Sequence, residues 1–171
     1  RVDYSIGVVV QTPRACVRMD RIALNSAIST VLFDCDALTE LVFGMSREET
    51  ESMLDVYMAD AGITTKNPFE TLDRKGVGAF INLAIRLFRK HESRETPFTP
   101  IGVCGNQTGY PVSIDFFSSL DVDYLCCSPD YLPTAKVAAA QAHIQFIKRQ
   151  LESMQFAVGH PPDFFAPMYH P

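Results

Sequence analysis

The feature that most constrains the fold is an alternation of short β-branched runs with stretches of helical spacing. Residues 4–11 (YSIGVVVQ) and 29–34 (STVLFD) are almost continuously apolar, and Val8-Val9-Val10 predicts a strand buried on both faces. Residues 99–104 (TPIGVC) and 122–127 (VDYLCC) predict two further strands. Because a helical stretch follows each run, the chain is predicted to form a parallel α/β sheet.

Several local signals place the helices. Ser46 and Glu49 form a capping-box pattern that predicts a helix start, and Asp73 is a second predicted N-cap. Pro133 is well placed to begin a long final helix that runs to about Met154. Other helices are expected after Thr12-Pro13, where Cys16, Met19, Ile22 and Ala23 recur at helical spacing, and over residues 110–120.

Four strands, each followed by helix, suit the C-terminal half of a (β/α)₈ barrel, because a complete barrel takes about 250 residues. An open doubly wound sheet is the structural alternative. We expect residues 1–157 to form this half-barrel domain and residues 158–171 to form an irregular tail rich in proline and aromatic residues. A half barrel would leave parallel edges unpaired, so we expect it to pair with a missing N-terminal half or to self-associate.

Composition narrows the function classes. The net charge is -5 and 20% of the residues are charged, so the chain lacks the excess of basic residues that is typical of a nucleic-acid binder. No apolar run approaches the roughly 20 residues needed to cross a bilayer, so a soluble, intracellular protein without a membrane partner is expected. The compartment stays open, and the last residues are not a peroxisomal tripeptide. The chain begins without Met, which suggests a piece of a longer protein.

The five cysteines have no C-x-x-C spacing, so neither a disulfide framework nor a structural zinc site is indicated. Cysteines in such a chain are most often small buried hydrophobes. Cys104 is the exception, because it ends a predicted strand between glycines, where barrel enzymes place reactive groups. The other polar groups expected at this edge of the sheet are Gln11, residues 34–37 (DCDA), residues 105–107 (GNQ) and Ser128.

Several segments occur in the order found in one known family. They are residues 7–15 (GVVVQTPRA), 33–48 (FDCDALTELVFGMSRE), 67–78 (NPFETLDRKGVG), 102–111 (GVCGNQTGYP), 123–129 (DYLCCSP) and 138–141 (AAAQ). Over about residues 3–141 the chain resembles the C-terminal part of the phosphoenolpyruvate/pyruvate-binding domain of pyruvate phosphate dikinase. The resemblance implies transfer of a phosphoryl group from a phosphohistidine on another domain to pyruvate, with magnesium as cofactor. It also implies a homodimer formed through this domain.

The resemblance assigns the acid/base cysteine to Cys104, in a substrate loop that includes Gly102, Gly105 and Asn106. The family's magnesium carboxylates, Glu and Asp, match Gln11 and Ala37, so neither anionic ligand is intact. Asp36, or Asp34, is a conceivable substitute ligand, or both are solvated loop carboxylates. Magnesium is therefore expected to bind weakly or not at all.

Two functions follow from these matches. In the first, the chain is a phosphoenolpyruvate/pyruvate-binding fragment that is impaired in metal-dependent phosphoryl transfer and acts as a scaffold or interaction domain. In the second, the full-length protein is an active dikinase that interconverts pyruvate, ATP and phosphate with phosphoenolpyruvate, AMP and diphosphate, with Cys104 as general acid/base. Whether the chain is part of an enzyme is left open by the sequence.

Overall fold

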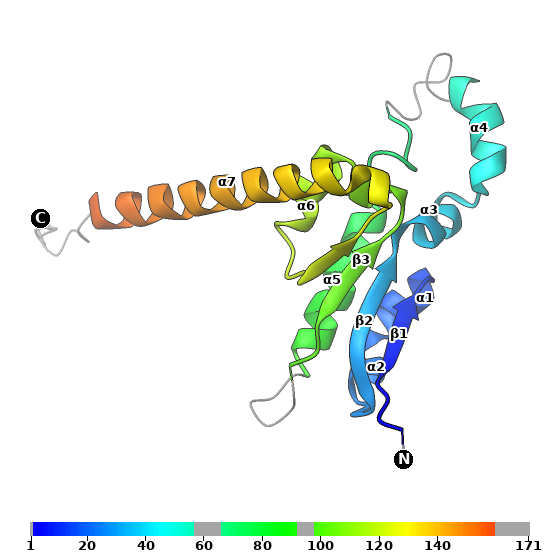
Figure 1. Ribbon diagram of the computed structural model, residues 1–171, viewed down its shortest axis with the longest axis horizontal. Coiled ribbons are helices and arrows are strands. Elements are labelled where there is room, and N and C mark those ends of the chain that lie inside the picture. Colours follow the sequence, from blue (N-terminus) through cyan, green and yellow to red (C-terminus); the bar gives the residue numbers. More distant parts are fainter. Residues whose placement is uncertain (1, 57–65, 92–97, 160–171) are drawn as a thin grey trace, which may run out of the picture.

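A computed structural model of the chain describes residues 2–56, 66–91 and 98–159. It contains a four-stranded parallel sheet in the order β1-β2-β3-β4 (Figure 1). The predicted strands are confirmed, with ends one or two residues shorter than the apolar runs in most cases. The strands are β1 (Ile6–Val10), β2 (Ile28–Asp34), β3 (Ile101–Cys104) and β4 (Tyr124–Cys126).

The helices connect successive strands. Helix α4 begins as predicted, since the Ser46 hydroxyl accepts a hydrogen bond from Glu49 N and the Glu49 carboxylate accepts one from Ser46 N. The main helices are α1 (Pro13–Val17), α2 (Met19–Ala23), α3 (Cys35–Phe43), α4 (Arg47–Asp55), α5 (Val77–Arg89), α6 (Pro111–Phe117) and α7 (Leu132–Gly159), with short 3₁₀ turns η2 (Asn106–Gly109) and η3 (Pro129–Tyr131).

One face of the sheet is covered by helices. Val10, Phe33 and Val103 belong to a buried cluster that also contains side chains of α1, α2, α3 and α5, and Leu125 of β4 packs against the same cluster and against α6 and α7. Helices α1, α2 and α5 lie together behind the sheet in Figure 1, and α7 extends away from it. All described helices that contact the sheet therefore use one face.

The opposite face, here called the open face, carries the alternate residues Val9, Leu32, Gly102 and Tyr124. Val9 is 53% exposed, so the prediction that β1 is buried on both faces is wrong for this chain. Sequential strand order and helices on a single face are the properties of a barrel, whose interior is lined by the other face. A doubly wound sheet would have helices on both faces and a reversal of strand order. The fold is the half of a (β/α)₈ barrel that the sequence predicted.

Some local predictions were wrong. The stretch after Pro13 forms two short helices rather than one, because Arg18 adopts a non-helical backbone conformation between them. Asp73 does not cap α5, whose N-cap is Gly76; its carboxylate accepts a hydrogen bond from Lys75 N instead. Helix α7 continues to Gly159, beyond the expected end at Met154, and the rest of the predicted tail, residues 160–171, lies outside the described residues.

Candidate functional site

The four strands end at one edge of the sheet, and their last open-face residues stand side by side. Cys104 pairs in register with Asp34 on β2 and with Cys126 on β4. Gln11, which follows β1, reaches the same row, because its side-chain Nε2 donates a hydrogen bond to Asp34 Oδ2 at 3.0 Å. Gln11, Asp34, Cys104 and Cys126 are called the strand-end row below.

Asp34 is held by hydrogen bonds on both carboxylate oxygens. Oδ2 accepts from Gln11, and Oδ1 accepts from Ala37 N at 3.1 Å, which makes Asp34 the N-cap of α3. A short polar residue at the junction of β2 and α3 satisfies a backbone donor that the helix leaves unpaired. Asp34 is therefore part of the framework of the site rather than a freely solvated carboxylate.

Asp36 lies in the first turn of α3 and joins the neighbouring loop. Its Oδ2 accepts a hydrogen bond from Asn106 N at 3.0 Å and lies 4.0 Å from Arg47. Its Oδ1 is buried and has no hydrogen-bond partner among the described residues. Burial raises the pKa of Asp36 above its ordinary value, although the hydrogen bond from Asn106 and the charge of Arg47 act in the opposite direction.

Cys104 sits at the carboxyl end of β3 and is partly exposed. Burial raises the pKa of its thiol to about 11, and the nearby carboxylates of Asp34 and Asp36 act in the same direction, as does the neighbouring Cys126. The thiol is consequently protonated at neutral pH. In this environment Cys104 is suited to donate a proton, and its sulfur reacts as a nucleophile only as the thiol loses that proton.

The two glycines beside Cys104 have different structural reasons. The Tyr124 ring lies directly against Gly102, where an added Cβ would collide with it. Gly102 belongs to strand β3 and does not lie in an open loop. Tyr124 OH lies 2.9 Å from the Thr30 hydroxyl, which itself donates to Pro100 O, so Tyr124 donates this bond. Gly105 has φ 119°, a conformation that other residues rarely adopt, and it turns the chain into η2.

The two residues after Gly105 fix the site to a more distant loop. Asn106 Nδ2 donates to Phe69 O at 3.0 Å, and Gln107, which is fully buried, donates through Nε2 to Pro68 O at 3.0 Å. Gln107 Nε2 also lies 3.3 Å from the Thr39 hydroxyl on α3. These amides hold the site loop between α3 and residues 67–72.

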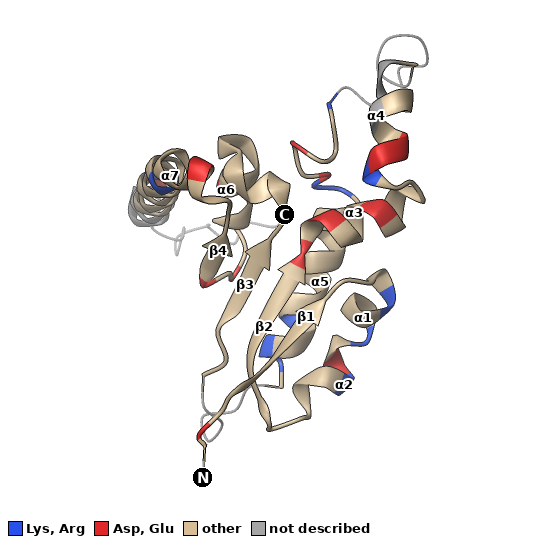
Figure 2. Cartoon of the chain, turned by 45° about the vertical axis from the view of Figure 1, so that its right-hand side comes forward, with Lys and Arg blue, Asp and Glu red and all other residues tan. Residues whose placement is uncertain are grey.

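A small cavity of about 250 Å³ opens beside the strand-end row. Figure 2 shows acidic segments in α3 and α4 near this end of the sheet. Two residues that line this cavity, Arg47 and Tyr131, were not predicted as site residues from the sequence. Arg47 could have been suspected, because it begins a capped helix close in sequence to the acids at 34 and 36. Nothing in the sequence around Tyr131 indicates that it belongs to the site. The cavity is lined by Asp36, Arg47, Gly105, Asn106, Cys126, Ser128 and Tyr131.

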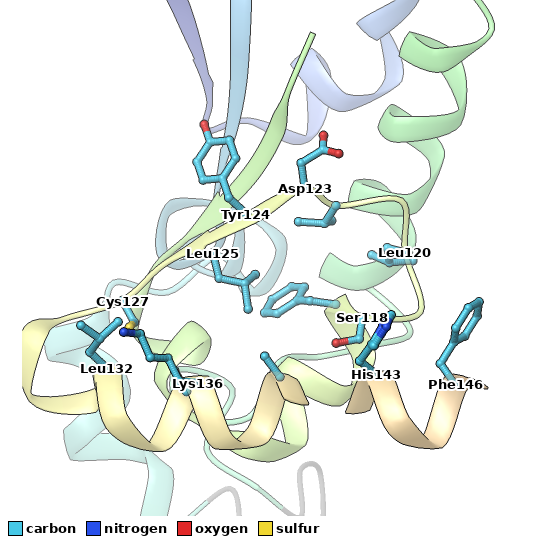
Figure 3. Close-up of a pocket in the computed structure, with 14 residues that line it drawn as sticks. Ser118, Leu120, Asp123, Tyr124, Leu125, Cys127, Leu132, Lys136, His143 and Phe146 are labelled. Atoms are coloured by element: carbon cyan, nitrogen blue, oxygen red, sulfur yellow. The ribbon is translucent and has the colours of Figure 1, made fainter. Parts of the chain in front are cut away.

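A larger, mostly apolar cavity of about 600 Å³ lies on the helix side of the sheet, between β4, α6 and α7 (Figure 3). Cys127, Leu125 and Lys136 contribute to its lining. Ser128, the N-cap residue of η3, makes no capping hydrogen bond with its side chain. Cys126 and Cys127 thus line cavities on opposite sides of the sheet.

The residues at the site do not reproduce a magnesium centre. The Gln11 side chain is neutral and Ala37 contributes only its backbone N–H, to Asp34. Both oxygens of Asp34 are used, which leaves Asp36 Oδ1 as the unpartnered carboxylate oxygen. Among the described residues, no three His, Cys, Asp or Glu side chains gather in a geometry that could hold a metal ion. This donor set lacks the paired anionic oxygens that Mg²⁺ prefers.

Comparisons with known proteins identify the chain's relatives. The sequence model of a family described as PEP-utilising enzyme, PEP-binding domain, matches residues 1–144. Pyruvate, phosphate dikinase of Rickettsia bellii is 36% identical over 145 residues, which are 85% of this chain and 16% of the relative. Chloroplastic pyruvate, phosphate dikinase of Mesembryanthemum crystallinum is 38% identical over 140 residues (82% of this chain and 14% of the relative). Pyruvate, phosphate dikinase of Giardia intestinalis is 41% identical over 144 residues (84% and 15%).

The chain thus spans about a seventh of the length of these curated relatives, with a match that begins before β1 and continues into α7. Within the described residues, no helix is long and apolar enough to span a membrane. The family match covers the sheet, the strand-end row and the loop that carries Cys104. The chain belongs to the PEP-utilising enzyme family and matches the PEP-binding domain found in proteins like pyruvate, phosphate dikinase.

Proposed function

We propose that this domain is impaired in metal-dependent phosphoryl transfer and acts as a scaffold or interaction domain within a longer protein. The observation that carries the proposal is the hydrogen bond from Gln11 Nε2 to Asp34 Oδ2, at 3.0 Å, formed where the family resemblance expects an anionic metal ligand. A Glu at position 11 could not donate this bond. It would instead place a second carboxylate beside Asp34.

Ala37 supports the same proposal. Its backbone N–H donates a hydrogen bond to Asp34 Oδ1, and its methyl side chain has no oxygen that could bind a metal ion. An Asp at this position would add a carboxylate in the first turn of α3, next to the cavity that Asp36 and Arg47 line. Magnesium is expected to bind weakly or not at all when both anionic ligands are missing.

The test is isothermal titration of the full-length protein with magnesium and oxalate, which mimics enolpyruvate. We expect no tight binding to the natural sequence. The double variant Gln11→Glu/Ala37→Asp should gain metal-dependent oxalate binding, and Ala37→Asn, which adds size without charge, is the matched control. Tight binding of magnesium and oxalate by the unchanged protein would overturn the proposal.

The second candidate is an active dikinase in which Cys104 is the proton donor. It is favoured by the place of Cys104 at the end of β3 and by its raised pKa, which keeps the thiol protonated at neutral pH. Such a thiol can protonate the methylene carbon of an enolate. Cys104→Ala should then abolish turnover of pyruvate or phosphoenolpyruvate, whereas Cys127→Ala, on the helix side, should not. The absence of turnover in the unchanged protein would rule this candidate out.

The partners proposed for this domain are the missing N-terminal half of the barrel and a second copy of the protein. The first is supported by the open face, on which apolar Val9 of the edge strand β1 is exposed beside Leu32. The dimer rests on the family resemblance. Sedimentation of the full-length protein at micromolar concentration should give a dimer, and a monomer would contradict that part of the proposal.

A further inference from the structure

Two thiols of the strand-end row occupy neighbouring positions on parallel strands. Cys104 and Cys126 are register partners at the ends of β3 and β4, and both side chains belong to the open face. Adjacent strands in a sheet lie about 4.8 Å apart. The Cα atoms joined by a disulfide usually lie roughly 4.4–6.8 Å apart, so this pairing falls within the range that a disulfide requires.

The surroundings leave this pair accessible and free to adjust. Cys126 is exposed and lines the small cavity beside Asp36 and Asn106, while Cys104 is partly exposed. Strand β4 has only three residues, and Cys126 is the last of them. A small movement at the end of such a short strand can bring the two sulfur atoms to bonding distance. The other thiols differ in this respect, since Cys16 and Cys35 are buried in the core and Cys127 faces the helix-side cavity.

We propose that Cys104 and Cys126 form an oxidisable dithiol that closes to a disulfide when the protein meets a hydroperoxide. The site takes a small peroxide as its reactant and is a modification site separate from any phosphoryl transfer. It does not depend on whether the domain binds magnesium or turns over substrate. Its consequence is that oxidation reversibly removes the Cys104 thiol from the strand-end row.

The chemistry balances in two steps. The exposed Cys126 sulfur attacks the terminal peroxide oxygen, the O–O bond breaks, and an alcohol or water leaves, so Cys126 becomes a sulfenic acid. The Cys104 sulfur then attacks the Cys126 sulfur, the S–O bond breaks, and water leaves with the proton of the Cys104 thiol. Two thiols lose two electrons in total, and the peroxide gains them.

The disulfide would also protect the two cysteines from irreversible oxidation. A sulfenic acid without a neighbouring thiol is oxidised further to sulfinic and sulfonic acids, which thiol reductants do not reverse. Formation of the Cys104–Cys126 disulfide stops this oxidation at a stage that thiol reductants can reverse. The protein should therefore recover both thiols after reduction.

The experiment treats the full-length protein with hydrogen peroxide, alkylates the remaining thiols, and maps cysteine-linked peptides by mass spectrometry without reduction. We expect a peptide pair that joins Cys104 to Cys126 and disappears after dithiothreitol. The same pair should form in Cys127→Ser, the matched control on the other side of the sheet. In Cys104→Ser the link should be absent, and Cys126 should resist recovery by dithiothreitol after strong oxidation.

A second measurement does not require oxidation. Phenylarsine oxide bridges two adjacent thiols, so the unchanged protein and Cys127→Ser should retain it on a gel-filtration column, and Cys126→Ser should release it. Recovery of Cys104 and Cys126 as separate alkylated or overoxidised residues in the unchanged protein would overturn the proposal. A disulfide between Cys104 and Cys35 would do the same, because it would show that the core opens before β4 moves.

Discussion

At the scale of single residues, the site is defined by how polar side chains satisfy one another. Asp34 accepts from both Gln11 and Ala37, and Asp36 accepts from Asn106, so each acid at the end of β2 has a structural partner. A carboxylate with hydrogen bonds from fixed donors is stabilised in place and is less free to move toward an ion. At positions 11 and 37 the chain therefore offers Asp34 two hydrogen-bond donors and adds no anionic charge of its own.

The raised pKa of Cys104 predicts how its reactivity changes with pH. Only the thiolate reacts with iodoacetamide, so the alkylation rate of Cys104 should increase from neutral pH toward about 11 and level off above it. Asp34→Asn removes a neighbouring negative charge and should shift this curve to lower pH. The rate is measured by mass spectrometry of the Cys104 peptide after quenching at each pH. A curve that levels off near the ordinary thiol pKa would contradict the prediction.

Gly102 predicts a steric effect at the same row. Gly102→Ala places a methyl group against the Tyr124 ring, which must move and lose its hydrogen bond to Thr30. We expect a loss of about 1–3 kcal/mol in the free energy of unfolding, measured by urea denaturation. The same change in the background Tyr124→Leu should cost much less, since a smaller side chain leaves room. Equal losses in both backgrounds would show that the ring is not the reason for the glycine.

At the scale of elements, the sequence predicted what depends on local pattern and missed what depends on contacts. The four strands and the start of α4 were recognised from apolar runs and the Ser46–Glu49 capping box, because those signals are contained in a few neighbouring residues. The cap at Asp73 failed because the Asp73 carboxylate accepts a hydrogen bond from Lys75 N before the helix begins, and Gly76 is the N-cap of α5. The Gln11–Asp34 bond joins residues 23 positions apart and could not be foreseen from either segment.

Arg89 at the end of α5 joins three parts of the chain. It donates to Asp123 Oδ2 at 2.7 Å, to Asp121 Oδ2 at 3.0 Å and to Thr99 O at 2.9 Å, and its side chain is only 15% exposed. Arg89→Met should lower the free energy of unfolding by about 2 kcal/mol, because hydrogen bonds to charged groups contribute roughly 1.5–3 kcal/mol. Arg86→Met, at an exposed position of the same helix, is the control and should change it by less than about 0.5 kcal/mol. Similar losses in the two variants, compared by urea denaturation, would argue against this role for Arg89.

At the scale of the whole molecule, the described residues form one helix layer against the sheet and leave its open face uncovered. The helix-facing side has a continuous apolar core, whereas Val9 and Leu32 on the open face contribute nothing to it. The sequence predicted a half barrel from strand count and chain length. It could not predict which apolar residues would be exposed, since every residue of a strand buried on both faces is apolar. Val9 and Val10 are the same residue type, but Val10 faces the helices and is buried, whereas Val9 is on the open face, where the rest of the barrel would lie.

This difference gives a prediction with opposite results in two settings. In the isolated chain Val9→Asn should change the free energy of unfolding by less than about 0.5 kcal/mol and reduce self-association, because Val9 is 53% exposed there. In the full-length protein the same change should cost about 2–3 kcal/mol, because the completed barrel would bury this side chain. Leu41→Asn on the outer side of α3, where Leu41 is 55% exposed, is the matched control and should have a small effect in both. Denaturation and sedimentation of each variant in both lengths decide the matter: if Val9→Asn is as harmless as Leu41→Asn in the full-length protein, the open face is not the interior of a barrel.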